Sequence, residues 1–377
     1  MSPLPPMQRA RQLVLAGTGP AHVHLLAALC ARPLPGAQIT LLTHSTDTVH
    51  DAMLSDYVAG HYALEQCQVA LAPFVQQTGL RWLRRNVSTL DAQQQTLELD
   101  DGSTLHYDWL SLNLEPQQER AHIEQTLPGA REHALFVHPT EVFCALWPKV
   151  VAMGMARALR VAVIASGVQG IELALALRAR LPNAAVTLVC GHAPLTEGLA
   201  PRVAQWLQAL LRERKVTVLQ DHATAVLADA VALGCGAHLA CDVPLLANAT
   251  QVPAWLSASA LARDAHGGIA TDASLRSASH PSVFATPGES SGVHLATTLE
   301  ANLRASVAGN PLQAPAPAAR RLQWIACGDA SAIATWGNYS ARGRALGWLK
   351  QWLDLRFVAL YSRNVKRGAT PAVSGST

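Results

Sequence analysis

The chain has 377 residues, of which half are hydrophobic and only 15% are charged. This composition excludes a disordered protein, and the length predicts two lobes with an appendage because domains contain about 150 residues each. The formal net charge of +3 is too small for a general nucleic-acid binder, and the basic residues gather in the stretch 340–367. We therefore expect no nucleic-acid partner.

The seven cysteines indicate a reducing compartment. No two of them have the C-x-x-C spacing, which excludes a thioredoxin-type redox pair and a zinc knuckle. The apolar stretch after Arg11 is interrupted by Gly17, Gly19 and Pro20, so it predicts a strand and a turn and not a signal peptide. The long uncharged stretch 243–262 contains two prolines and predicts no membrane span. The sequence thus predicts a cytoplasmic protein.

A strand, a glycine-rich turn, a helix and a second strand occur twice along the chain. The first unit has its strand, helix and second strand at residues 12–16, 23–31 and 38–43. The second unit has them at residues 160–165, 171–180 and 185–190. Parallel strands joined by helices are typical of an α/β fold, and two such units predict two Rossmann-like dinucleotide-binding lobes.

The remaining strand signals lie between and after these units. Alternating apolar residues on either side of Asp101-Gly102 predict an antiparallel hairpin over 97–107. Further strands are expected at 216–219 and 283–285. After a proline-rich linker that begins at Pro311, the pattern predicts a hairpin over 322–336 and a helix from about Arg342 to Tyr361.

The first glycine turn reads Gly17-Thr18-Gly19-Pro20-Ala21-His22. In a dinucleotide fingerprint the first glycine makes the tight turn and the second lets the backbone approach the pyrophosphate at a helix N-terminus. The third position is His22, which packs less closely than glycine, and no acid ends the second strand to hold a ribose hydroxyl. An ordinary strand-to-helix turn therefore stays open as the alternative.

The second turn keeps Gly167 and Gly170 but has Ala165 at the first glycine position. If that position needs a positive φ, alanine costs about 1 to 2 kcal/mol, whereas micromolar binding is worth about 8 kcal/mol. A nucleotide site would be weakened and not abolished. The strand that follows ends at His192 with neither an acid nor an arginine, so the sequence does not distinguish NADH from NADPH.

Several segments together resemble a known family. They are GTGPAHVHLL, HDAMLSDYVAGHY at 50–62, SGVQGIELALAL at 166–177, HPSVFATPGES at 280–290 and GRALGWLKQWLDLRFVALY at 343–361. They are similar to the two-dinucleotide flavoproteins related to type II NADH dehydrogenases, within the pyridine nucleotide-disulfide oxidoreductase superfamily. The resemblance is nearest to the NADH-dehydrogenase-like domain that accompanies selenophosphate synthetase (selenide, water dikinase), although we expect no synthetase after Thr377.

This resemblance implies a FAD-binding lobe over 8–115 and 267–305, interrupted by an NAD(P)H-binding lobe over 140–266. A C-terminal hairpin and helix would occupy 311–367, followed by a disordered tail over 368–377. Hydride would pass from nicotinamide to the flavin, and electrons would leave to a small-molecule acceptor such as a quinone. No cysteine pair is needed for such a reaction, because the cofactor supplies the chemistry.

The resemblance also implies cofactor-binding residues, although it leaves the catalytic residues unknown. It implies that Gly17, Gly19 and His22 line the FAD turn, Gly167 and Gly170 line the NAD(P)H turn, Glu172 lies near the nicotinamide, His50 and Met53 lie near the flavin, and Gly288 and Glu289 hold its ribityl chain. For Glu172 the alternative is an acid that the helix dipole favours. At the last site an inserted residue and Pro287 alter the family pattern.

These departures support a second hypothesis, in which a degenerate homologue keeps the fold but acts as a binding or regulatory module linked to selenium metabolism. A metal site is not expected, because the fifteen histidines form neither an H-E-x-x-H motif nor a Cys/His cluster.

The C-terminal helix carries two apolar stripes. At 100° per residue one stripe contains Leu346, Leu349, Leu353, Phe357 and Leu360, and it is expected to pack on the body. The second contains Trp348, Trp352 and Leu355 and is flanked by arginines. It predicts either peripheral contact with the inner face of the membrane, a homodimer contact, or burial beneath the hairpin.

Overall fold

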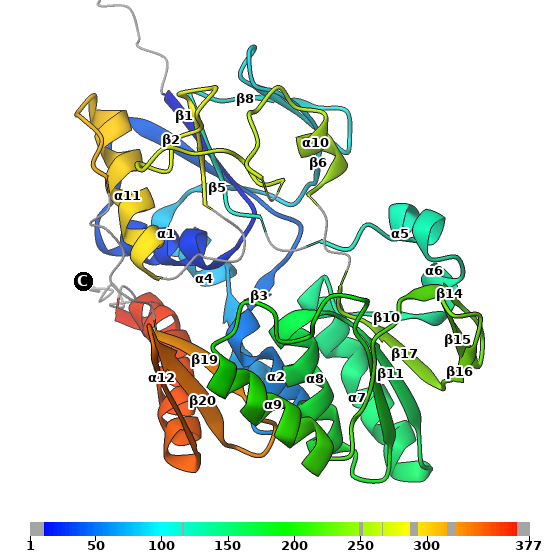
Figure 1. Ribbon diagram of the computed structural model, residues 1–377. Coiled ribbons are helices and arrows are strands. Elements are labelled where there is room, and N and C mark those ends of the chain that lie inside the picture. The colour runs from blue at the N-terminus through cyan, green and yellow to red at the C-terminus, as the bar shows by residue number, and fades with distance from the viewer. Residues whose placement is uncertain are drawn as a thin grey trace, which may run out of the picture.

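The computed structural model describes residues 11–114, 117–248, 252–265, 267–286, 293–314 and 322–367. Two five-stranded sheets form two separate lobes, the first drawn mainly in blue and yellow in Figure 1 and the second mainly in green. Every strand pairing within these two sheets is parallel. The prediction of an α/β fold with two Rossmann-like lobes is confirmed.

The first sheet has the strand order β18-β9-β1-β2-β5. Its strands are β1 (Arg11–Ala16), β2 (Ala37–Leu42), β5 (Arg81–Leu83), β9 (Trp109–Leu112) and β18 (Val283–Ala285). Leu13, Val14 and Leu15 in the central β1 are fully buried, as expected for a strand covered on both faces. The helices α1 (Pro20–Ala31) and α11 (Val293–Ala308) pack against each other beside this sheet.

The second sheet has the order β10-β17-β11-β12-β13. Its strands are β10 (Leu135–Phe136), β11 (Arg160–Ile164), β12 (Ala185–Val189), β13 (Thr217–Leu219) and β17 (Val243–Leu246). The helices of this lobe are α7 (Thr140–Ala156), α8 (Gly167–Arg180) and α9 (Pro201–Glu213). Helix α7, which contains Pro148 in its interior, and helix α9 were not predicted from the sequence.

Short elements fill the space around the two sheets. In the first lobe they are β3 (Asp47–Val49), the 3-10 helix η1 (Asp51–Met53), α2 (Leu54–Ala59), α3 (Leu64–Cys67), β4 (Gln68–Ala70) and α4 (Ala72–Thr78). The hairpin predicted around Asp101-Gly102 is present, since Leu97 pairs with Leu105, and it belongs to a three-stranded sheet of β6 (Val87–Asp91), β7 (Thr96–Leu99) and β8 (Thr104–His106). The other elements are α5 (Arg120–Thr126), α6 (Ala130–His133), α10 (Ala254–Ser257) and the sheet β14 (Ala223–Val226), β15 (Ala230–Leu233) and β16 (His238–Ala240).

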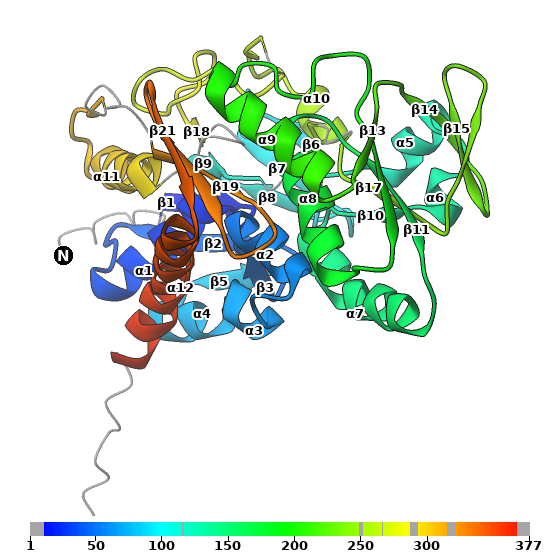
Figure 2. The same cartoon turned by 60° about the horizontal axis from the view of Figure 1, so that its bottom comes forward.

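The C-terminal region forms a three-stranded antiparallel sheet followed by a long helix. The predicted hairpin corresponds to β19 (Leu322–Ala326) and β20 (Ala332–Trp336), to which the structure adds β21 (Tyr339–Gly343). The helix α12 (Arg344–Arg367) lies alongside α1 and β20, as Figure 2 shows. Within the described ranges no helix combines the length and the apolar character that crossing a bilayer requires. The predicted tail over 368–377 lies outside the described residues.

The prediction for the stripes of α12 was partly wrong. The buried face carries Gly347, Lys350, Asp354, Val358 and Tyr361, whereas Leu353 and Leu360 of the expected stripe are exposed. The reason is that Lys350 and Asp354 are satisfied by a buried ion pair, which hydropathy alone does not reveal. The second stripe is exposed, with Trp348 at 67% and Trp352 at 44%, so burial beneath the hairpin is excluded.

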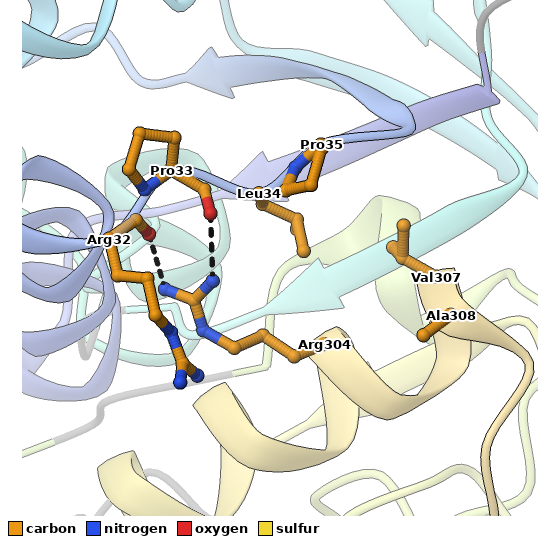
Figure 3. A pocket seen from close by; sticks show the side chains of 7 residues that line it. All are labelled: Arg32, Pro33, Leu34, Pro35, Arg304, Val307 and Ala308. Carbon is orange, nitrogen blue, oxygen red and sulfur yellow. Dashed lines mark hydrogen bonds between the residues drawn. The ribbon is translucent and has the colours of Figure 1, made fainter.

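A surface recess of about 430 Å³ lies at the C-terminal ends of α1 and α11, and Figure 3 shows the seven residues that line it. Arg304 reaches across it and donates hydrogen bonds to the carbonyl oxygens of Arg32 at 2.7 Å and Pro33 at 3.1 Å. A guanidinium at this position satisfies carbonyls that a helix end leaves without partners. The recess is therefore at the opposite end of α1 from the glycine turn and has a structural explanation.

Candidate nucleotide-binding turns and the lobe interface

The first glycine turn is packed against Asn113, which follows β9. Gly17 has a φ of +89°, and a Cβ there would lie 2.4 Å from the Asn113 backbone oxygen. A Cβ on Gly19 would lie 2.6 Å from Oδ1 of the same asparagine. Both glycines are therefore required, but the group they approach closely in this structure belongs to the chain itself.

Asn113 also caps the N-terminus of α1. Its Oδ1 accepts hydrogen bonds from the backbone N–H groups of Ala21 at 2.9 Å and His22 at 3.0 Å. Its Nδ2 donates to Oγ1 of Thr286 at 2.6 Å, which fixes the orientation of the amide. Pro20, the first residue of the helix, has no N–H to offer. The donors that a pyrophosphate would use at this helix end are thus taken by a side chain.

His22 occupies the third fingerprint position and points into the lobe. It is fully buried, with Nδ1 2.8 Å from the Gly17 oxygen and Nε2 2.8 Å from Ser111 Oγ. Because the Gly17 oxygen can only accept, Nδ1 carries the proton and Nε2 accepts from the Ser111 hydroxyl. Burial lowers the pKa of His22 to about 4, so the ring is neutral at pH 7. Its observed role is to hold the turn against β9.

The second turn is open. The N-cap residue Ser166 makes no capping hydrogen bond to α8, and Ser166 and Gln169 are exposed. A Cβ on Gly167 would meet nothing within 4 Å, while one on Gly170 would lie 2.9 Å from the Ala165 Cβ. Gly170 thus allows close helix-to-strand packing, and the space beside Gly167 at the start of α8 is open.

Ala165 does not carry the strain that the sequence suggested. The left-handed residue of this turn is Gly167, with a φ of +63°, and Ala165 is not among the residues with positive φ. The helix begins directly at Gly167, whereas α1 begins one residue after Gly19. The alanine is therefore compatible with the turn, because the position that requires glycine has moved by two residues.

Equivalent positions in the two sheets explain why α1 is capped by a side chain and α8 is not. The Asn113 N–H donates to the oxygen of Ala16, the last residue of β1, and the Ala247 N–H donates to that of Ile164, the last residue of β11. The residue that follows the neighbouring strand is thus asparagine in the first lobe and alanine in the second. A methyl group cannot cap a helix, so α8 keeps its N-terminal donors.

The loop predicted to lie near a flavin is covered by α12. The His50 ring stacks on Phe357, with centroids 4.2 Å apart, and burial, followed by the Lys350 charge, lowers the pKa of His50 to about 4. Met53 is fully buried in the same loop. The sequence analysis placed both residues at a ring site, whereas the structure shows them in contact with, or next to, the C-terminal helix.

Lys350 fixes α12 to this loop. Its Nζ donates to the Ala52 oxygen at 2.9 Å, to Asp56 at 2.7 Å and to Asp354 at 2.8 Å. All three ammonium protons are used, and the three residues are at most 9% exposed. Burial lowers the pKa of Lys350, but the two carboxylates outweigh it and the net shift is upward. Sequence patterns did not reveal this cluster, because Asp56 is 294 residues away from Lys350.

Glu172 lies on α8 where this helix meets the C-terminal sheet. Its Oε1 accepts a hydrogen bond of 2.6 Å from the Ala326 N–H in β19. Burial raises the pKa of Glu172 to about 7, although the Ala326 hydrogen bond and Lys350 lower it. A helix-dipole acid would have a lowered pKa, so desolvation dominates here. The carboxyl is poised to exchange a proton near neutral pH.

Residues 11–291 match the sequence profile of the pyridine nucleotide-disulphide oxidoreductase family. The chain belongs to this family. A search of curated protein sequences finds no match.

Solved structures show the same fold at low identity. The sulfide:quinone oxidoreductase of Aquifex aeolicus aligns with a TM-score of 0.76 at 16% identity, over 94% of this chain and 92% of that one. NDH2 of Plasmodium falciparum, solved with NADH, aligns with a TM-score of 0.75 at 10% identity, over 96% and 97%. A putidaredoxin reductase solved in covalent complex with putidaredoxin aligns with a TM-score of 0.68 at 19% identity, over 96% and 99%. At these identities the likeness is one of fold.

The family implies two cofactors, and the two turns differ in how they fit them. The α8 turn fits a nucleotide pyrophosphate, because its helix N-terminus is not capped and Ala247, the counterpart of Asn113, is small. The α1 turn does not fit one as it stands, because Asn113 takes the N–H groups of Ala21 and His22. Gly288 and Glu289, predicted to hold a ribityl chain, lie outside the described residues.

The structure brings together one group that the sequence analysis missed. His192, Asp221 and His222 place ligand-type atoms within 4.8 Å of one another. His192 follows β12 and the other two follow β13, and the ends of neighbouring parallel strands meet at one edge of a sheet. This strand-end relation is the signal that could have identified them, since their sequence spacing follows no metal-binding motif.

Proposed function

We propose that this family member is an NAD(P)H-dependent oxidoreductase that binds its nicotinamide nucleotide at the α8 turn. The observation that carries the proposal is the uncapped N-terminus of α8 next to Ala247, where a pyrophosphate can accept backbone N–H groups and meet the positive end of the helix dipole. Gly167 and Gly170 would line the nucleotide, as the sequence predicted. Glu172, one turn further along α8, would lie at the boundary between the nucleotide lobe and the C-terminal sheet.

In its finer form the proposal includes a flavin. The family supports FAD in the first lobe, with Gly17, Gly19 and His22 at the pyrophosphate and Gly288 and Glu289 at the ribityl chain. FAD would accept hydride from NAD(P)H and pass electrons to an acceptor such as a quinone. The conformation of the α1 turn argues against bound FAD, since Asn113 must release the backbone N–H groups of Ala21 and His22 before a phosphate can bind them. We therefore derive no step through the flavin.

The same observation favours a second candidate function. If Asn113 stays in place, the first lobe is a closed scaffold and the chain acts as a nucleotide-binding or regulatory module. The stacking of His50 on Phe357 agrees with this candidate, because it fills the loop where a flavin ring was expected. The link to selenium metabolism rests on the sequence resemblance to the selenophosphate synthetase-associated domain.

One purification separates the two candidates. The protein is examined for flavin absorbance before and after incubation with FAD, and then for bleaching when NADH or NADPH is added without oxygen. Bound flavin that bleaches supports the oxidoreductase, whereas a colourless protein that binds NADH or NADPH by calorimetry supports the binding module. A protein that binds neither flavin nor nicotinamide nucleotide contradicts both candidates.

We also propose that α12 makes the partner contact that its sequence predicts. Trp348 and Trp352 are exposed, and Trp336 and Tyr339 of the adjacent sheet stack on each other at 52% and 69% exposure. The two alternatives are peripheral membrane contact and a homodimer. Co-sedimentation with anionic vesicles and light scattering of the purified protein distinguish them, and a monomer that ignores vesicles contradicts both.

A further inference from the structure

We propose that His192, Asp221 and His222 form a binding site for a zinc-class divalent metal ion, with a fourth coordination position left for water. It lies at the carboxyl edge of the second sheet, in the loops after β12 and β13, beside the turn that joins β15 to β16. The α8 turn follows β11 at the same edge of the sheet, and the proposed site follows the next two strands, β12 and β13. The proposal does not depend on the proposed function.

The distances between the ligand atoms suit tetrahedral zinc. Nε2 of His192 lies 3.0 Å from Nδ1 of His222, and that atom lies 3.3 Å from Oδ1 of Asp221. Zinc binds nitrogen and oxygen at about 2.0 to 2.2 Å, and tetrahedral geometry then separates neighbouring ligand atoms by roughly 3.3 to 3.6 Å. The Asp221–His222 pair already has this separation, whereas the histidine pair must open slightly and the His192 and Asp221 atoms, which lie within 4.8 Å of each other, must adjust to it.

The loops that carry these ligands are tied to one another by backbone hydrogen bonds. The Gly191 N–H donates to the Asp221 oxygen at 2.9 Å, and the Gly234 N–H donates to the His222 oxygen at 3.0 Å. A Cβ on Gly234 would lie 2.2 Å from Cε1 of His222, so only glycine allows the β15–β16 turn to approach the imidazole this closely. The three segments thus hold the donors in place before any ion arrives.

Asp221 is fixed as a carboxylate. Its Oδ2 accepts from the Cys235 N–H at 3.0 Å and its Oδ1 from the His222 N–H at 2.7 Å. Backbone donors therefore orient both carboxylate oxygens, and Oδ1 lies 3.3 Å from Nδ1 of His222.

The donor chemistry selects the ion. Two imidazoles and a carboxylate form a nitrogen and oxygen set that favours zinc over magnesium or calcium, which prefer oxygen ligands alone. A hydrogen bond between His192 and His222 is the competing explanation for their 3.0 Å contact. It accounts for the two rings, but it does not account for a carboxylate at the same point.

The test uses untagged, chelator-treated full-length protein and Zn²⁺ in competition with a chromophoric chelator. We expect one zinc per chain with a Kd below about 1 µM. His192→Ala and His222→Ala should each weaken binding by more than about 100-fold, because loss of an outer-shell partner alone costs 10- to 100-fold. His238→Ala is the matched control, since His238 is exposed on β16 of the same region and outside the cluster.

Cobalt reports the coordination geometry directly. Co²⁺ bound to the wild-type protein should show the visible absorption of a four-coordinate site, which His192→Ala and His222→Ala should remove and His238→Ala should keep. Melting temperatures without metal establish that each variant is folded. Wild-type protein that binds no Zn²⁺, or both histidine variants binding it like the wild type, would overturn the site.

Discussion

The two glycine turns of this protein follow the same path through two similar sheets, yet only one has a free helix N-terminus. Asn113 caps α1, whereas its counterpart Ala247 leaves α8 open. The turn with the better fingerprint, Gly17-Thr18-Gly19, is the closed one. A glycine fingerprint therefore indicates that another group approaches the backbone of the turn closely. The residue after the neighbouring strand decides whether that group is a ligand or a side chain of the protein.

The largest effect should come from Lys350, which holds α12 against the closed lobe. Lys350→Met leaves Asp56 and Asp354 buried without their counter-charge, and we expect a loss of about 3 to 5 kcal/mol in the free energy of unfolding. Urea denaturation measures it. Arg344→Met, at an exposed position of the same helix, is the control and should change stability by less than about 0.5 kcal/mol. Equal stabilities of the two variants would show that the buried cluster contributes nothing.

Glu172 links the open lobe to the C-terminal sheet in a pH-dependent way. Its pKa is raised from 4.5 to about 7, so the folded state binds more protons than the unfolded state between these values. Stability from this group is present below pH 4.5 and is lost as pH rises to 7, by about 3 kcal/mol. Glu172→Gln should flatten this part of the stability profile. A variant that keeps the wild-type slope would assign the dependence to another group.

Exchanging the cap tests the comparison itself. Ala247→Asn should place an amide over the N-terminus of α8 and weaken NADH or NADPH binding about 100-fold, because a phosphate loses charge-assisted hydrogen bonds worth about 1.5 to 3 kcal/mol each. Calorimetric titration measures the affinity. Ala247→Ser, whose hydroxyl is too short to cap the helix in the same way, is the matched control. Unchanged affinity in the asparagine variant would remove the α8 turn as the nucleotide site.

The reverse exchange should have the smallest effect on stability. Asn113→Ala removes the cap of α1 and should lower the free energy of unfolding by about 1 to 2 kcal/mol. It should also increase the amount of flavin that stays bound after incubation with FAD, because the first turn then has an uncapped helix like the second. Absorbance measures the bound flavin. Thr286→Val, which removes the hydroxyl that orients the amide, should act in the same direction but more weakly. No gain of flavin in either variant would mean that Asn113 is not what closes the lobe.

The sequence predicted the elements that depend on local pattern. The strands around both turns, the hairpin at Asp101-Gly102 and the strand at 283–285 all follow from period and turn chemistry, and the structure has them. Helix α7 was missed because Pro148 is a poor residue for a helix interior, although flanking burial of residues such as Phe143 and Trp147 stabilises it.

The candidate sites depended on contacts that no local pattern contains. Asn113 meets Ala21 across 92 positions, and Lys350 meets Asp56 across 294. His192 and His222 come together only because β12 and β13 are neighbours. The sequence identified the glycines of the turns but not the group that packs against them. Glycine allows a phosphate and an asparagine to approach the backbone equally closely.

The order in which the two sheets can be completed follows from β18. All strands of the second sheet lie between residues 135 and 246, whereas the first sheet needs Val283–Ala285 to cover β9. During synthesis the first sheet therefore cannot be completed until the inserted lobe has emerged from the ribosome. Until then the edge of β9 stays unpaired. An unpaired edge is a site of aggregation, so prompt folding of the inserted lobe shortens the period of risk for the nascent chain.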